Sequence, residues 1–259
     1  VHSSRNTAVG SNSLESHNLA SAGNGYNTAV GYNSGLAVTT GTLNTFVGGL
    51  AGDANTTGAS NTGLGFQALS ANTTGASNVA VGSGALTSNT TGAGIVAVGK
   101  NSMNSNTTAI DNTAVGMNSL FTNTTGASNA AFGRNALQAN TTASNNTAVG
   151  YLSLEANTTG AQNVAVGQGS ANSNTTGFSL VAVGREALEA NTTAGNNTAV
   201  GERALFKTTT GADNTSVGQS SMSENTTGAS NVAVGVEALD ANTTGASNTA
   251  IGVSALGAN

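Results

Sequence analysis

Glycine recurs along this chain at a fixed interval, and that interval constrains the fold more than any other feature. Fourteen glycines follow one another with every gap equal to 17 residues, and Gly10 lies 21 residues before the first of them, which indicates a four-residue insertion within 11–30. A period this regular is typical of a solenoid, whose repeats pack only on their neighbours. The fourteen are Gly31, Gly48, Gly65, Gly82, Gly99, Gly116, Gly133, Gly150, Gly167, Gly184, Gly201, Gly218, Gly235 and Gly252.

The repeat reads N-T-A-V-G-x-x-A-L-x-A-N-T-T-G-A-S, and we number its positions from the recurring glycine as position 0. Position −1 is Val in eleven of the fourteen repeats, position +4 is mostly Leu, and Asn fills twelve of fourteen at both −4 and +7. Seventeen residues are too few for a helix pair, and Asn, Thr and Gly are poor helix formers. We therefore predict an all-β fold, a β-solenoid (β-roll) of about 15 coils, each with two strands of about five residues and two turns.

Stacking turns each repeat position into a column that runs from coil to coil. An Asn column can hydrogen-bond amide to amide along the stack. The Val and Leu columns predict a thin apolar core, and small Ala and Ser at fixed positions favour close approach of neighbouring chains, hence a homo-oligomer, either a trimer or a head-to-tail stack. Residues 1–30 form an irregular first part and residues 31–259 the regular solenoid. The expected core residues are Val81, Val98, Val115, Val149, Val166, Val200, Leu69, Leu86, Leu137 and Leu188.

Composition argues against several functional classes. Charged residues make up 7% of the chain, the net charge is −5, and there is no Cys, so we expect no nucleic-acid partner and no thiol chemistry. No apolar run approaches the roughly 20 residues that span a membrane, so we expect no insertion. The two histidines, His2 and His17, do not form a catalytic or metal-ligating pattern, and "GGLAGD" at 48–53 lacks the spacing of a calcium-binding repeat. We expect no enzyme activity, no metal and no cofactor.

The units "NTAVGxxAL" and "ANTTGASN" resemble two related groups of repeats. One is the head repeat of trimeric autotransporter adhesins, and the other is the "NTAIGxxAL…NTTG" repeat of tail-fibre-type proteins. The resemblance covers about residues 6–259 and implies a left-handed, trimeric β-roll on a cell or virion surface that serves attachment. The 17-residue period is longer than that of the adhesin head, and no stalk, anchor or chaperone domain is seen.

The variable positions +1, +2 and +5 carry most of the charge and several aromatic side chains, so we expect them to face outward. Either they form a solvated face with contacts between subunits, or they form a stripe that binds a surface glycan or receptor. The candidate recognition residues are Tyr32, Phe66, Tyr151, Phe121 and Phe206.

Two further functions of the Asn-Thr-Thr triplets stay open. Each triplet is formally an N-glycosylation acceptor, although the turn itself explains its composition. Thr columns also suggest an ice-binding solenoid, but adjacent Thr residues in a strand point to opposite faces and do not form a two-column array.

The 17-residue register continues when a second copy is placed after the first. Gly252 and the Gly10 of a following copy are 17 positions apart, with Val1 and His2 next to Asn259 at the junction and Leu256 in the final coil. This favours end-to-end stacking into a filament; a fragment of a longer fibre is the competing explanation. The function we predict is an extracellular structural fibre for attachment, with an ice- or glycan-binding module or a phage tail-fibre shaft as alternatives.

Overall fold

The structure is a computed structural model that describes residues 5–17 and 25–257. The chain forms two compact units, Val1–Ser128 and Asn129–Asn259, which we call the N-terminal and C-terminal units. Throughout the described residues the secondary structure consists of short strands and turns. The predicted all-β solenoid with 17-residue coils is confirmed.

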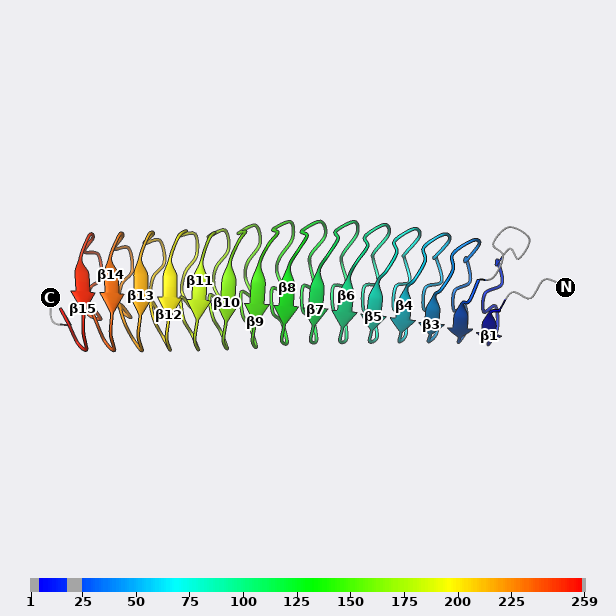
Figure 1. The fold of residues 1–259 in the computed structure, drawn as a ribbon, viewed down its shortest axis with the longest axis horizontal. Helices are drawn as coiled ribbons and strands as arrows, with labels where there is room; N and C mark the ends of the chain where they lie inside the picture. Colours follow the sequence, from blue (N-terminus) through cyan, green and yellow to red (C-terminus); the bar gives the residue numbers. More distant parts are fainter. Residues whose placement is uncertain (1–4, 18–24, 258–259) are drawn as a thin grey trace. The chain divides into compact units, whose positions relative to one another are not determined.

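In each unit the strands follow one another in chain order, and each pairs with the next in parallel (Figure 1). Paired residues are 17 apart, as in Val79↔Val96, except between the first two strands, where Thr7 pairs with Thr28. The N-terminal unit contains β1 (Thr7–Val9), β2 (Thr28–Val30), β3 (Thr45–Val47), β4 (Thr62–Leu64), β5 (Val79–Val81), β6 (Val96–Val98) and β7 (Thr113–Val115). The C-terminal unit contains β8 (Ala130–Phe132), β9 (Thr147–Val149), β10 (Val164–Val166), β11 (Val181–Val183), β12 (Thr198–Val200), β13 (Thr215–Val217), β14 (Val232–Val234) and β15 (Thr249–Ile251).

The first coil keeps the same register as the later ones. The N–H of Leu14 donates to the carbonyl of Ser34 at 3.1 Å, just as the N–H of Leu69 donates to that of Ala85. His17 therefore occupies position +7, where most later coils carry Asn. The four additional residues then fall within 18–24, outside the described residues.

The expectation of two five-residue strands per coil is wrong, because each described coil has one strand of three residues. Positions +2, +4 and +12 adopt the left-handed conformation, as in Gln67 (φ 58°), Leu69 (φ 58°) and Ser77 (φ 60°). A residue in the left-handed conformation ends a strand, and for Leu this conformation costs about 1–2 kcal/mol. Hydrogen bonds between coils hold these turns, since Gln67 N–H donates to Gly49 O and Ser77 N–H to Ala59 O, both at 3.0 Å.

The recurring glycine is required by how closely the coils approach one another. Gly82 has φ 133°, and a Cβ added there would lie 2.6 Å from the carbonyl oxygen of Gly99 in the next coil. Both the dihedral angle and this contact exclude a side chain. The glycines therefore recur at a constant interval because the backbones of neighbouring coils come this close at the same position of every repeat.

The predicted Val column is wrong, and the predicted Leu column is confirmed. In a three-residue strand the middle side chain points to one face and its neighbours to the other. The middle residue, Ala in most strands, is the one that points inward: Ala80, Ala97 and Ala114 are fully buried. The Val residues expected inside are half-buried or exposed: Val81, Val98, Val115, Val149, Val166 and Val200. The expected Leu residues are fully buried: Leu69, Leu86, Leu137 and Leu188.

Two buried Asn columns form hydrogen-bonded ladders, as the sequence predicts. At position +7, Asn72 Nδ2 donates to Asn55 Oδ1 at 2.8 Å and to the carbonyl of Gly75 at 3.0 Å. At position −4, the backbone N–H of Asn44 donates to Asn27 Oδ1 at 2.9 Å. Each amide therefore satisfies backbone groups that the turns would otherwise leave unpaired.

One aromatic residue replaces several smaller ones in the core. Phe46 is fully buried at a position where most coils have Ala, and position +4 is Gly52 in its own coil and Gly35 in the preceding one. A Cβ added at Gly52 would lie 2.4 Å from the Phe46 ring, and one added at Gly35 would lie 3.2 Å from it. The ring thus fills the volume that Leu side chains occupy in other coils.

This exchange of volume predicts strong coupling between the two sites. Gly52→Leu restores the usual residue but overpacks against the ring, and we expect it to lower the free energy of unfolding by about 1–3 kcal/mol. Phe46→Ala should cost about 3–5 kcal/mol through the cavity it leaves. In the double variant the Leu side chain should refill part of that cavity, so the loss should be well below the sum of the two. Urea denaturation of the four proteins measures this, and additive losses would contradict the packing described.

Candidate functional site

The five candidate recognition residues lie on the surface, but in different columns. Tyr32, Phe66 and Tyr151 occupy position +1 and are 59%, 54% and 45% exposed. Phe121 and Phe206 occupy position +5 and are half-buried. Their shared role in a recognition stripe stays a prediction.

The structure places each of these aromatic side chains close to only a few other surface residues. In the N-terminal unit the Phe66 ring leans over Gly49, 3.5 Å from where a Cβ would be, in the column that also holds Tyr32. In the C-terminal unit the Arg134 guanidinium lies 5.9 Å from the Tyr151 ring centroid, and that of Arg203 lies 4.1 Å from the Phe206 ring centroid. Three other exposed aromatic residues, Tyr26, Phe132 and Phe178, were not among the predicted recognition residues.

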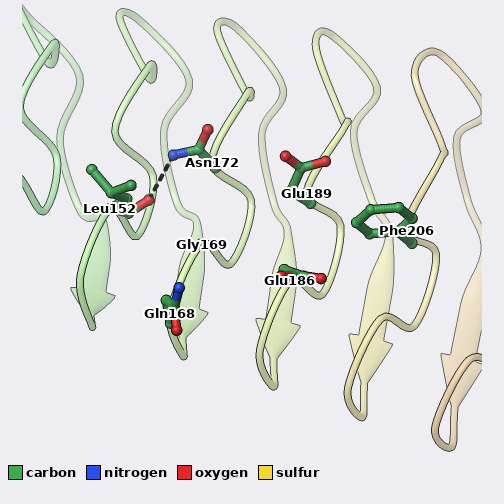
Figure 2. Close-up of a pocket in the computed structure, with 7 residues that line it drawn as sticks. All are labelled: Leu152, Gln168, Gly169, Asn172, Glu186, Glu189 and Phe206. Atoms are coloured by element: carbon green, nitrogen blue, oxygen red, sulfur yellow. Dashed lines mark hydrogen bonds between the residues drawn. The ribbon is translucent and has the colours of Figure 1, made fainter.

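Phe206 lines a pocket of about 260 Å³ in the C-terminal unit (Figure 2). The pocket lies between the +2 column and the +5 column of four successive coils. Its lining residues are Leu152, Gly169 and Glu186 at position +2, Asn172, Glu189 and Phe206 at position +5, and Gln168 at position +1. A sequence signal for it exists, because Gly169 stands where most repeats carry a side chain.

Ion pairs hold one side of this pocket. The Glu186 carboxylate accepts from Arg185 at 2.8 Å and lies 3.6 Å from Arg203 Nε. Arg185 also pairs with Glu202 of the next coil. In the part of the chain that the structure describes, the Glu189 carboxylate takes part in no hydrogen bond or ion pair. The pocket thus offers one satisfied and one free carboxylate.

The Asn-Thr-Thr triplets have a structural role in the folded chain. Their asparagines are fully buried, apart from the half-buried Asn242, and the +7 ladder uses their amides. A glycan has no room at a buried amide, so the fully buried triplets are not acceptors in the folded chain. The buried ones are Asn55, Asn72, Asn89, Asn106, Asn123, Asn140, Asn157, Asn174, Asn191 and Asn225.

Thr208 replaces Asn in the +7 ladder and interrupts it. Asn225 Nδ2 donates to Thr208 Oγ1 at 3.3 Å, but Thr208 donates to the backbone carbonyl of Asn225 rather than back to Asn191. Asn191 Oδ1 is buried and has no hydrogen-bond partner among the described residues.

None of the remaining sequence candidates is among the residues that line the pocket. Among residues 5–17 and 25–257 no group of three or more His, Cys, Asp or Glu side chains could hold a metal ion. Burial lowers the pKa of His17. Of the expected junction residues, Leu256 is 44% exposed, and Val1, His2 and Asn259 lie outside the described residues. The junction stays a prediction.

A second surface in each unit is formed by the outward side chains of the strands. Positions −3 and −1 place mostly Thr and Val in two adjacent columns, as in Val79 and Val81 of β5 or Val164 and Val166 of β10. The exceptions are Leu64, Ala130, Phe132 and Ile251. Val164 and Val166 are 38% and 36% exposed. No charged residue occupies position −3 or −1 in any repeat. We call this surface the Thr/Val face.

Comparison with known proteins gives no relative for this chain. No family model, no curated protein and no solved structure matches it. No helix in the described residues is long and apolar enough to cross a membrane.

Asp53, within the "GGLAGD" segment, is a partly buried carboxylate in the N-terminal unit. Its Oδ1 has no partner among the described residues. Burial raises the pKa of Asp53 above its usual 3.8, and the backbone N–H groups of Asp53 and Ala54 offset part of that rise. The ionised form is therefore disfavoured in the folded state.

This raised pKa predicts a pH-dependent effect of Asp53→Asn. A carboxyl whose pKa is higher in the folded state stabilises the fold below pH 3.8, and this contribution is lost as the pH rises through the folded pKa. Asp53→Asn should therefore raise the melting temperature at pH 7, and its advantage should shrink as the pH falls toward 3.8. Thermal unfolding from pH 3 to 8 measures this, with Ser70→Asn, at position +5 of the next coil, as the control. An advantage that grows on acidification would show that the carboxylate is stabilised by its surroundings.

Proposed function

We propose that this chain is a structural repeat protein that forms an extracellular fibre or filament used for surface attachment. The observation that carries the proposal is the Thr/Val face, where each unit turns outward two columns of uncharged, mostly β-branched side chains that are half-buried or exposed. Copies of the same chain would associate through this face.

The distribution of polar groups favours other copies of the chain as the partner. Contiguous apolar patches beyond a few hundred Å² are rare on soluble monomers and mark association sites. Covering such a patch contributes about 25 cal/mol per Å² of apolar surface. Identical chains carry identical charges, so a self-association surface must exclude like charges. All 17 charged side chains lie in other columns, among them Lys100 at +1, Glu186 at +2 and Lys207 at +6.

Three copies around a common axis are the arrangement we propose, in keeping with the resemblance to adhesin-head and tail-fibre repeats. In such a trimer the Thr/Val faces point toward the axis, and the variable +1, +2 and +5 columns stay outside. The outer columns are then free to contact a surface glycan or receptor. The proposed location is a cell or virion surface.

Ice binding is the second candidate, and the same face supports it. Outward Thr and Val at −3 and −1 form a regular two-column array, which the adjacent Thr residues of the triplets do not. A chain that bound ice through this array would leave the array uncovered by other protein chains. A phage tail-fibre shaft is the other alternative. It would use the Thr/Val face in the same way as an adhesin and differ from it in biological source.

Charges placed on the Thr/Val face should abolish assembly and leave the coils intact. We expect the wild-type chain of 24.9 kDa to behave as a trimer in sedimentation equilibrium. Val81→Glu with Val98→Glu should give a monomer, because the interface would desolvate two unpaired charges per chain. Circular dichroism should be unchanged, since both side chains point outward.

Lys100→Glu, at position +1 of the coil that carries Val98, is the matched control and should remain trimeric. A monomeric wild-type chain, or double-variant chains that assemble normally, would rule out this interface. A monomeric chain that shows thermal hysteresis would establish the ice-binding alternative.

A further inference from the structure

We propose that the pocket around Gly169 is a carbohydrate-binding site that takes one neutral hexopyranose ring of a glycan. The inference rests on the proposed attachment function, because it names the class of ligand that the outer columns recognise. It depends on a different surface from the Thr/Val face, so the two can fail separately.

The pocket exists because one side chain is missing from the +2 column. A Cβ added at Gly169 would meet only Glu186 Cγ, at 3.8 Å. Gly84 has the same repeat position in the N-terminal unit, but its space is occupied, since a Cβ there would lie 2.6 Å from Asn101 Oδ1. The gap at Gly169 is therefore open, whereas the equivalent gap at Gly84 is filled by a neighbour.

The free polar groups around this gap are mostly hydrogen-bond acceptors. Asn172 uses its amide hydrogens on Leu152 O at 3.0 Å and Glu155 Oε2 at 3.2 Å, so its Oδ1 remains to accept (Figure 2). The Glu189 carboxylate can accept at both oxygens, and the exposed Gln168 amide can donate as well as accept. A ligand rich in O–H donors matches this set.

An aromatic ring at one end gives the pocket an apolar surface. The Arg203 guanidinium lies over the Phe206 ring, 4.1 Å from its centroid, and Arg203 Nε is 3.6 Å from the Glu186 carboxylate. These contacts hold the ring before any ligand arrives. The C–H face of a pyranose can pack on such a ring while its hydroxyls donate to the acceptors.

Charge and size narrow the class of sugar. The free Glu189 carboxylate disfavours an anionic sugar, and two arginines offset the charge of Glu186, which weakens the pocket as a cation site. Its 260 Å³ is below the ~300–1,000 Å³ of most small-molecule sites. One ring of a glycan therefore fits, and binding gains strength when several chains present the pocket together.

The test is titration of the wild-type chain with simple glycosides, with binding monitored by saturation-transfer NMR. The probes are the methyl glycosides of glucose, galactose and mannose, with the methyl glycoside of N-acetylneuraminic acid as the anionic probe and lysine methyl ester as the cationic one. We expect at least one neutral glycoside to bind and the other two probes not to. Phe206→Ala and Gly169→Leu should each weaken that binding at least tenfold, and Leu is tolerated at position +2 in Leu152 (φ 60°).

Phe178→Ala, at an exposed aromatic residue of the same unit that does not line the pocket, is the control and should bind as the wild type does. The Val81→Glu, Val98→Glu double variant should bind one glycoside per chain unchanged, which separates this site from assembly. Three results would overturn the proposal. The first is that none of the three neutral glycosides binds. The second is that Phe206→Ala and Gly169→Leu chains with native circular dichroism bind as well as the wild type, and the third is that lysine methyl ester binds preferentially.

Discussion

Hydrogen bonding from coil to coil is the constraint on which the rest of this structure depends. A single 17-residue coil has one three-residue strand and cannot satisfy its own backbone groups. In the stack its N–H groups reach neighbours on both sides, as when Gly82 donates to Leu64 and Val79 to Ile95. The Asn ladders add side-chain bonds in the same direction. Left-handed Leu residues and crowded glycines persist because the neighbouring coils fix them.

Much of this fold could be predicted from the sequence, because a repeat position becomes a column in the structure. The period, the inward Leu column and the Asn ladders follow from it. The orientation of the strand could not be predicted from hydrophobicity alone. Val81 is more apolar than Ala80, but the inward position of the strand lies against the +4 column and has room only for a small side chain where that column carries Leu. Phe46 with Gly52 was a usable signal: where the middle residue of the strand is large, the facing +4 position is small. The left-handed conformation at position +4 had no such signal, as Leu is an unusual residue there.

The same separation of columns explains how one chain can assemble and still present a variable surface. Inward columns are nearly constant because they must fit the next coil. The Thr/Val face varies only among uncharged residues, which suits contact with identical chains. The +1, +2 and +5 columns are free to vary, so a pocket such as that around Gly169 can arise from one missing side chain. Of the predicted surface residues, only Phe206 lines it, because Gln168 and Asn172 are ordinary polar residues until stacking places them around a gap.

Repair of the interrupted Asn ladder tests the dependence on coil-to-coil bonding most directly. Thr208→Asn supplies an amide where Asn191 Oδ1 now has no partner among the described residues. If the ladders stabilise the stack, this substitution should raise the free energy of unfolding, measured by urea denaturation, by about 1 kcal/mol. The slope of that free energy against urea concentration should stay the same. Unchanged or lower stability would show that the Asn columns merely fill space and that the account of the stack is wrong.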